Sequence, residues 1–455
     1  MPLHSPAPSL HTEIRQTLRL ALPIMAGQLG QMLLGLADTL MIGRLSSGEL
    51  AAAALVNLLF HTSVVLGIAL SAAVSVQVSH AHGANLSAAE VLRHGFWLSL
   101  GFGLLLMALL FGGVPLLPFL RQPPEVIRLV PVYLRWVAAS AFFLFPILVL
   151  KSFAEARHHP WPVFSLMMAG VLLNIGLNRL LIFGFGPLPA LGLPGAGIAT
   201  FLSRAATVLS LWIYLHRSRS LSSHLPRRWR QPLDPSECGT LLRIAAPISG
   251  QMLLEFGAFA FSAILIGRFG VLPLAAHQIA ITCAATTYML PLGLSMAVTI
   301  RVGHALGRND LPATRRIAFS AQLFGLLMMG TFALTYLLAG PLIAAAFTPD
   351  PDLRALTTTL LMITAVFQLF DGIQIISMGG LRGLKDVNTP ALLVLGCYWF
   401  LALPLGSWLG FQRGLEARGL WIGLACGLAL SSLALSLRLL RKLRHPGPVQ
   451  DPPYA

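Results

Sequence analysis

The chain of 455 residues is 56% hydrophobic and only 10% charged, with a mean hydropathy of +0.77. Soluble domains carry ~25% charged residues, so the composition excludes a water-soluble protein and indicates helices that cross a bilayer. The net charge of +15 is scattered over short segments between apolar stretches, which excludes the single basic patch of a nucleic-acid-binding protein.

Twelve apolar segments follow one another along the chain, each bounded by Gly, Pro or charged residues. A bilayer core of ~30 Å needs roughly 20 apolar residues per helix, a length that each segment reaches. The stretch before the first segment lacks the apolar region of a signal peptide, so we expect no cleavage there. The predicted spans are residues 18–43, 50–79, 96–120, 130–150, 162–184, 195–216, 241–267, 274–300, 317–346, 355–380, 390–411 and 419–440.

The longest polar segment divides the spans six and six. We therefore predict an N-terminal six-helix lobe over 1–216, a basic linker over 217–240, a C-terminal six-helix lobe over 241–440 and a tail over 441–455. The connections on the linker's side of the membrane hold about three times as many Lys and Arg as the other side, so the positive-inside rule places the linker and both termini in the cytoplasm.

The two predicted lobes are repeats of one another. An offset of 224 residues, kept without a gap, places Gly43-Arg44 on Gly267-Arg268 and His80-Ala81 on His304-Ala305. Six spans per repeat give both repeats the same orientation in the membrane. The prediction is thus an all-α integral membrane protein of two pseudo-symmetric lobes around a central cavity, an arrangement suited to alternating access.

Three acidic residues fall well inside predicted spans: Asp38, Glu255 and Asp371. An acidic side chain near the bilayer centre costs at least ~2.5–3.5 kcal/mol, so it normally faces a polar cavity or partner. The alternative is a structural hydrogen bond. We predict that all three carboxylates take part in cation coupling.

Helical spacing gives these carboxylates polar and aromatic neighbours. Gln251, Glu255 and Phe259 are successive i+4 neighbours, and Phe367 lies one turn before Asp371. Amides suit hydrogen bonding to a carboxylate, and aromatic rings suit cation–π contact with an organic cation. A desolvated pair such as Glu255 with Asp371 can exchange a proton or hold a small cation, sodium included; the pattern does not choose between them.

Four more polar residues inside spans are candidates for substrate or relay roles. Asn174 and Asn178 lie at i and i+4, and we expect them near Asp38; helix-packing hydrogen bonds are an equal alternative. His277 and Gln278 begin the eighth span, where packing is the commoner role of a histidine. Arg204 also lies deep in a span, and the sequence offers no account of it.

Several segments together resemble the multidrug and toxic compound extrusion (MATE) family, and within it the NorM branch. They are ALPIMAGQLGQMLLGLADTLMIGRL from Ala21, LNIGLNRLLIFG from Leu173, GLPGAGIAT from Gly192, GQMLLEFGAFAFSAILIG from Gly250, LAAHQIA from Leu274 and GGLRGLKDVNTP from Gly379. The resemblance covers all twelve spans. It implies two six-helix lobes in a V around a central cavity, and export of organic cations in exchange for sodium ions or protons.

The resemblance also implies roles for individual residues. Glu255 and Asp371 match the second-lobe cation site of the NorM branch, and Asp38 with Asn174 and Asn178 matches its first-lobe polar cluster. Some relatives have a tyrosine where this chain has Phe367, and a carboxylate where it has Asn178. Both departures leave the coupling ion open between proton and sodium.

The sequence lacks the residues and motifs that other functions would need. A lipid-linked-precursor flippase of the same superfamily, the nearest alternative, is expected to need an arginine-rich cavity and often two extra spans. An enzyme would show a motif such as DxxxD or HExxH, and an ATP-driven pump GxxxxGK[ST]; none occurs. We therefore expect no enzyme activity and no cofactor, but a monomeric multidrug exporter of a bacterial inner membrane, contacting lipids and cationic drug-like molecules.

Overall fold

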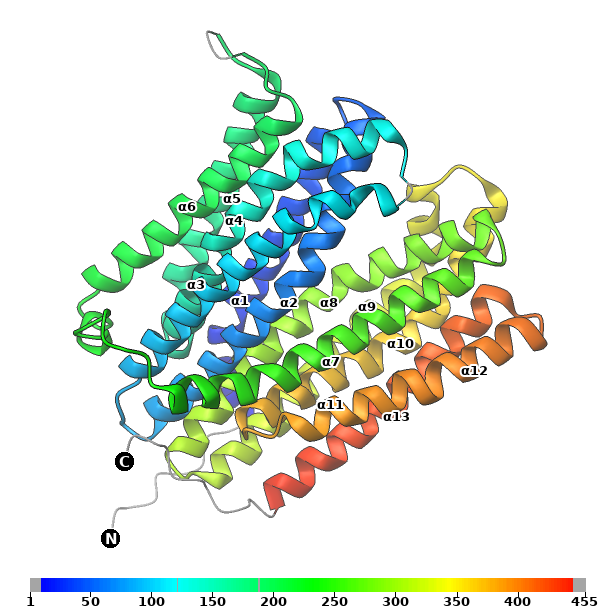
Figure 1. Cartoon of the computed structure of the whole chain (residues 1–455). Coiled ribbons are helices and arrows are strands. Elements are labelled where there is room, and N and C mark those ends of the chain that lie inside the picture. The colour runs from blue at the N-terminus through cyan, green and yellow to red at the C-terminus, as the bar shows by residue number, and fades with distance from the viewer. Residues whose placement is uncertain (1–9, 121, 187–188, 445–455) are drawn as a thin grey trace. The chain divides into compact units, whose positions relative to one another are not determined.

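The computed structural model describes residues 10–120, 122–186 and 189–444, and it is built of helices throughout this part of the chain (Figure 1). Twelve helices are long and apolar enough to cross a membrane, which confirms the predicted number of spans. The α-helices are α1 (Leu10–Ile42), α2 (Ser47–Gly83), α3 (Ala89–Gly112), α4 (Pro124–Ala156), α5 (Pro160–Phe183), α6 (Leu193–Arg217), α7 (Pro235–Gly267), α8 (Val271–Gly307), α9 (Leu311–Phe347), α10 (Pro351–Gly383), α11 (Asn388–Leu395), α12 (Leu403–Ser407) and α13 (Glu416–Arg444).

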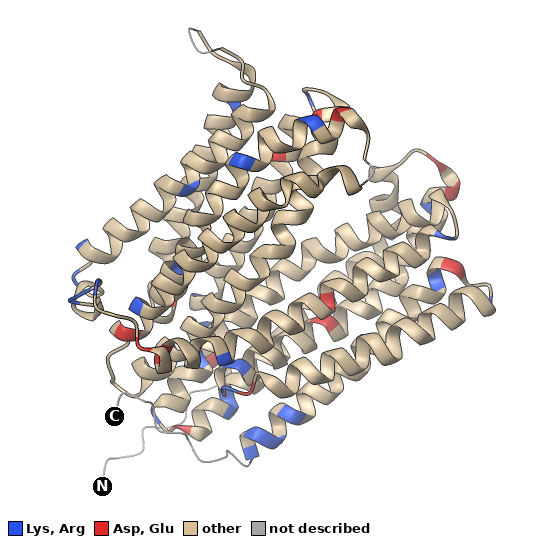
Figure 2. Cartoon of the chain, viewed as in Figure 1, with Lys and Arg blue, Asp and Glu red and all other residues tan. Residues whose placement is uncertain are grey.

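Two predicted spans differ from simple α-helices. The third span ends as an α-helix at Gly112, before the predicted residue 120, and a 3₁₀ helix follows over Val114–Leu120 because its prolines cannot donate α-helical hydrogen bonds. The eleventh span, Asn388–Gln412, includes two π-helical turns, Gly396–Ala402 and Trp408–Gln412. Uncharged residues make up most of the length of each helix, and basic residues gather in the last turn of α13 (Figure 2).

The repeat predicted from the sequence reappears in the helix boundaries. Helix α8 begins and ends 224 residues after α2, and both have 37 residues. Each is followed by an asparagine in the left-handed region, Asn85 with φ 58° and Asn309 with φ 57°. Asparagine tolerates this backbone better than most residues, so the same local sequence ends both helices in the same way.

Contacts between helices divide the chain into two compact units, residues 1–25 with 250–455 and residues 26–249. We call these the second-half unit and the first-half unit. The division cuts through α1 and α7, whereas the predicted lobes begin and end at the linker. The lobe boundaries rest on membrane spans and stay a prediction, and the tail beyond Arg444 lies outside the described residues.

Glycines allow α13 to pack closely on the eleventh span within the second-half unit. A Cβ atom added at Gly423 would lie 2.4 Å from the backbone of Gly406, and one at Gly427 would lie 2.4 Å from the side chain of Ala402. Side chains cannot approach so closely, so the glycines here are required by helix packing, as in small-residue interfaces of other membrane helices.

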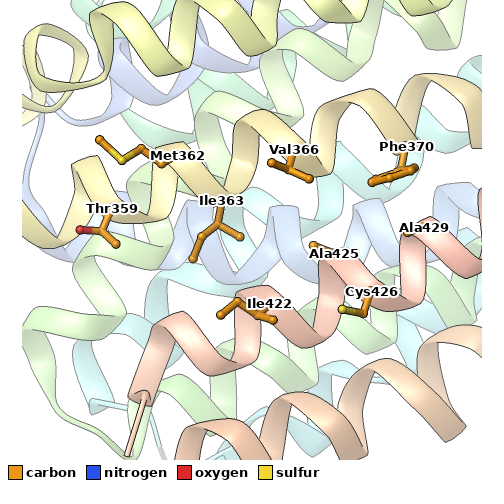
Figure 3. Close-up of a pocket in the computed structure, with 9 residues that line it drawn as sticks. All are labelled: Thr359, Met362, Ile363, Val366, Phe370, Ile422, Ala425, Cys426 and Ala429. Atoms are coloured by element: carbon orange, nitrogen blue, oxygen red, sulfur yellow. The ribbon is translucent and has the colours of Figure 1, made fainter.

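An apolar groove of about 440 Å³ runs between α10 and α13 (Figure 3). Its lining residues are uncharged: Thr359, Met362, Ile363, Val366, Phe370, Ile422, Ala425, Cys426 and Ala429. Asp371 follows Phe370 in the chain but is buried and does not line the groove. The groove therefore offers no charged ligand for a cation.

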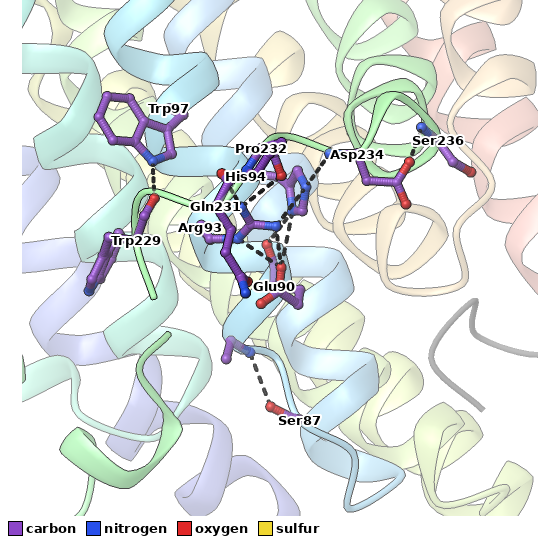
Figure 4. Close-up of polar contacts among 11 residues, drawn as sticks. Ser87, Glu90, Arg93, His94, Trp97, Trp229, Gln231, Pro232, Asp234 and Ser236 are labelled. Carbon is purple, nitrogen blue, oxygen red and sulfur yellow. Dashed lines mark hydrogen bonds and ion pairs between the residues drawn. The ribbon is translucent and has the colours of Figure 1, made fainter. Parts of the chain in front are cut away.

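The predicted linker is tied to the start of α3 in the first-half unit (Figure 4). Arg93, which forms an ion pair with a glutamate one turn earlier, donates through Nη1 to the carbonyls of Gln231 at 2.7 Å and Pro232 at 3.0 Å. Trp97 Nε1 donates to the carbonyl of Trp229 at 2.8 Å. These bonds satisfy backbone groups of an irregular segment, so the linker has a defined course over α3.

Candidate cation and substrate site

Glu255 of α7 and Asp371 of α10 lie in the second-half unit, in which α7 contributes its residues from Gly250 onward. Asp371 is 7% exposed, and the two carboxylates repel each other electrostatically. Two negative charges in an apolar surrounding are unfavourable together, and a proton or a small cation relieves the repulsion. The sequence-based pairing of Glu255 with Asp371 as a coupling site stays a prediction.

Gln374 connects Glu255 with a tyrosine that sequence reasoning missed. Gln374 Nε2 donates to Glu255 Oε1 at 2.9 Å and to the hydroxyl of Tyr398 at 3.4 Å. Gln251 and Tyr398 also hydrogen-bond to Glu255. Tyr398 stands in a π-helical turn, a local structure frequent at functional sites, and no periodic pattern in the sequence predicts such a turn.

One oxygen of this cluster has no partner. Within the described residues, the buried Oε1 of Gln374 accepts no hydrogen bond, although the Nε2 of the same amide is bound to Glu255. An unpaired acceptor in a buried site is costly. A proton on the carboxylate or a bound cation would each give it a partner, because hard cations take oxygen ligands.

Aromatic rings line the same region. Phe259 makes edge contacts with Phe367 at a centroid distance of 6.0 Å and with Tyr398 at 5.9 Å. Phe367 contacts Trp421 at 5.9 Å. Phe367 supplies only a ring, and a hydroxyl near Glu255 comes from Tyr398.

The two remaining candidates, His277 and Gln278, belong to α8. His277 is buried, and its Nδ1 accepts a hydrogen bond of 3.2 Å from Trp421 Nε1, which fits a packed histidine. Gln278 is exposed. Arg382 and Tyr288 interact electrostatically with Glu255, and neither was predicted. Arg382 lies two residues beyond the predicted tenth span, in a connection between spans.

The first-half unit holds a second polar cluster around Asp38 of α1. Asn178 Nδ2 donates to Asp38 Oδ1 at 2.5 Å and to Asn174 Oδ1 at 2.8 Å. Asn174 Nδ2 in turn donates to Ser203 Oγ at 3.2 Å. The predicted proximity of the two asparagines to Asp38 is therefore confirmed, and the chain of bonds extends from α1 through α5 to α6.

Known proteins are similar to this chain over most of its length. The MatE family model matches residues 23–180 and 247–408, more than half of the chain. A protein of Bradyrhizobium diazoefficiens named as a probable multidrug resistance protein NorM is 37% identical over 440 residues, which cover 95% of this chain and 94% of that protein. A protein of the same name from Rhodopseudomonas palustris is 35% identical and covers 95% and 93%.

Solved structures show the same fold. A crystal structure of a MATE protein in the bent conformation has a TM-score of 0.88 at 21% identity and covers 96% of both chains. A MOP-superfamily transporter from Pyrococcus furiosus has a TM-score of 0.88 at 22% identity and covers 95% of this chain and 96% of that one. With the family model and the relatives, these likenesses identify the chain as a member of the MatE family, the multidrug and toxic compound extrusion family that its motifs resemble.

Proposed function

We propose that this chain is a secondary multidrug efflux transporter that exports organic cations in antiport with protons or sodium ions by alternating access. The observation that carries the proposal is the pair of Glu255 and Asp371, two mutually repelling carboxylates within helices apolar enough to span a membrane. Arg382 supplies one positive charge near Glu255, and two carboxylates leave a second charge to be neutralised, which a proton or a small cation can do. The shared name of the relatives, multidrug resistance protein, supports drugs as the exported substrate.

The coupling cation binds between Glu255 and Asp371 in this proposal. A proton would neutralise one carboxylate and donate to a neighbouring oxygen, for which the unpaired Oε1 of Gln374 is available. A sodium ion would take the carboxylate oxygens and Gln374 Oε1 as ligands, and the hydroxyl oxygen of Tyr398 would be a further ligand. The residues present fit a proton and a sodium ion, and transport under each gradient alone distinguishes the two.

The aromatic contacts of Phe259 and Phe367 beside the carboxylates support an organic cation as the exported molecule. Rings attract a cation through their faces and accept varied apolar shapes, which suits a transporter of several drugs. We further propose that the protein works as a monomer in the inner membrane of a bacterium, surrounded by lipids and with both termini in the cytoplasm, as the distribution of basic residues predicts.

Reconstituted protein tests this function directly. Proteoliposomes loaded with ethidium would be given either a sodium gradient or a proton gradient, each imposed alone. Ethidium export driven by one of them is expected, and export should stop when Glu255→Gln or Asp371→Asn replaces the wild type. Ethidium movement that ignores both gradients would overturn the proposal.

A further inference from the structure

The linker carries three exposed arginines around one tryptophan. Arg227, Arg228 and Arg230 flank Trp229, and we call residues 227–230 the arginine segment. Among the described residues, no acidic side chain lies within ion-pair distance of these three arginines. Three positive charges within four residues repel one another, so the segment favours a negatively charged partner from outside the protein.

Trp229 is held on aromatic side chains of two helices. Its ring centre lies 4.6 Å from that of Trp212 on α6 and 5.3 Å from that of Phe96 on α3. Its carbonyl also accepts the hydrogen bond from Trp97 Nε1 (Figure 4). The residue between the arginines is therefore fixed to the first-half unit, and the three charges have a defined place on it.

The linker is also attached on both sides of the arginine segment. Before the segment, Leu221 and Leu225 are buried. After it, the backbone N–H of Asp234 donates to His94 Nε2 at 3.0 Å, in addition to the two bonds that Arg93 makes to linker carbonyls. With its leucines buried and its arginines exposed, the linker has one side against the protein and one cationic side outside.

The aromatic cluster under the arginine segment marks the ends of two membrane spans. Phe96 is the first residue of the predicted third span, and Trp212 lies four residues before the end of the predicted sixth. Tryptophan is enriched where a span meets the lipid headgroups, because its ring is apolar and its N–H group is polar. Figure 2 shows basic residues on the loop that follows α6. These positions place the arginine segment at the level of the headgroups.

We infer that the arginine segment binds anionic phospholipids of the cytoplasmic leaflet through their phosphate groups. A guanidinium group donates paired hydrogen bonds to phosphate oxygens. Negatively charged lipids also attract a basic segment that lies within a Debye length of the membrane surface. The inference goes beyond the proposed antiport and uses only its topology, with the linker in the cytoplasm. It depends neither on the exported molecule nor on the coupling ion.

Native mass spectrometry of the full-length protein tests the inference. The protein in detergent is incubated with equal concentrations of anionic phosphatidylglycerol and zwitterionic phosphatidylcholine, and the lipids that stay bound are counted. The wild type is expected to retain phosphatidylglycerol preferentially. Replacing Arg227, Arg228 and Arg230 together by glutamine should lower this preference by about tenfold or more. Replacing all three by lysine keeps the charge and should keep most of the preference.

The matched control removes three exposed arginines from the opposite side of the predicted topology, by Arg44→Gln, Arg128→Gln and Arg413→Gln in one protein. Its preference for phosphatidylglycerol should equal that of the wild type. Melting temperatures show that each variant is folded. An unchanged preference in the folded glutamine variant of the arginine segment would overturn the inference.

A parallel sample distinguishes a lipid from a soluble phosphate compound. Glycerol phosphate, which has the phosphate but no acyl chains, is added at the concentration of the lipids and should displace little phosphatidylglycerol. Displacement of most of it would mean that the segment binds soluble phosphates, and would also overturn the inference. Failure of the antiport would instead appear as absent gradient-driven export by the wild type, with the lipid counts unchanged.

Discussion

Asn178 donates a hydrogen bond of 2.5 Å to Asp38, although the two residues stand 140 positions apart in the chain. The bond joins α5 to α1, and Asn178 passes the contact on to Asn174. A carboxylate accepts this bond best when it is charged, whereas a protonated carboxyl group also needs an acceptor. Protonation of Asp38 would therefore change the contact between the two helices.

Asp38→Asn should imitate the protonated state permanently. We expect nearly unchanged ethidium affinity but an efflux rate reduced by about tenfold or more, because the switch between two helix arrangements is lost. Affinity and efflux would be measured on the same purified mutant. Near-normal efflux would instead mean that Asp38 only anchors helix packing, since asparagine retains much of that hydrogen bonding.

Glu255→Gln and Asp371→Asn should each abolish gradient-driven efflux while the protein still folds. The amide keeps the shape of the side chain and removes the charge that a coupling cation needs. Asp352→Asn, at the exposed start of the same helix as Asp371, is the matched control and should transport like the wild type. Wild-type efflux by both site mutants would remove the pair from the coupling mechanism.

The charge of the drug should matter more than its size. Ethidium is expected to be exported, and an anionic dye of similar size should be ignored, because three carboxylates of the spans are candidates and would repel it. Efflux of the two dyes from proteoliposomes would be compared under one gradient. Equal rates would indicate an apolar site in which the carboxylates select nothing.

Gly423→Ala should destabilise the second-half unit by about 1–3 kcal/mol, because the new Cβ would lie 2.4 Å from the backbone of Gly406 and force α13 away. Gly330→Ala in α9 has no atom within 4 Å of its Cβ and should leave stability unchanged or raise it by up to ~1 kcal/mol. Melting temperatures in detergent would show the difference. Equal melting temperatures of the two mutants would contradict the close contact between Gly423 and Gly406.

Arg93→Ala should loosen the linker from α3, since two hydrogen bonds to the linker carbonyls of Gln231 and Pro232 depend on this side chain. Trypsin sites at Arg227, Arg228 and Arg230 would then be cut several-fold faster. Arg243→Ala, an exposed arginine of α7, serves as the control and should be cut like the wild type. Unchanged cleavage of Arg93→Ala would show that the linker is held by other contacts.

The sequence by itself determined the spans, the repeat and the family, and it predicted that Glu255 pairs with Asp371. Length and hydropathy suffice for the spans because a lipid bilayer leaves the backbone few alternatives to the helix. The repeat could be read because the same residue types recur at one offset, Asn85 and Asn309 among them. These are local properties, in which neighbours along the chain decide the outcome.

Only the tertiary structure decided which polar side chains join each cluster. Tyr398 reaches Glu255 through Gln374 from a π-helical turn, and Arg204 of α6 donates a hydrogen bond to Ser140 of α4. Neither follows from spacing, because helical periodicity gives the face of a residue but not which helix packs against that face or how each helix is rotated. That choice is made by packing between segments more than a hundred residues apart.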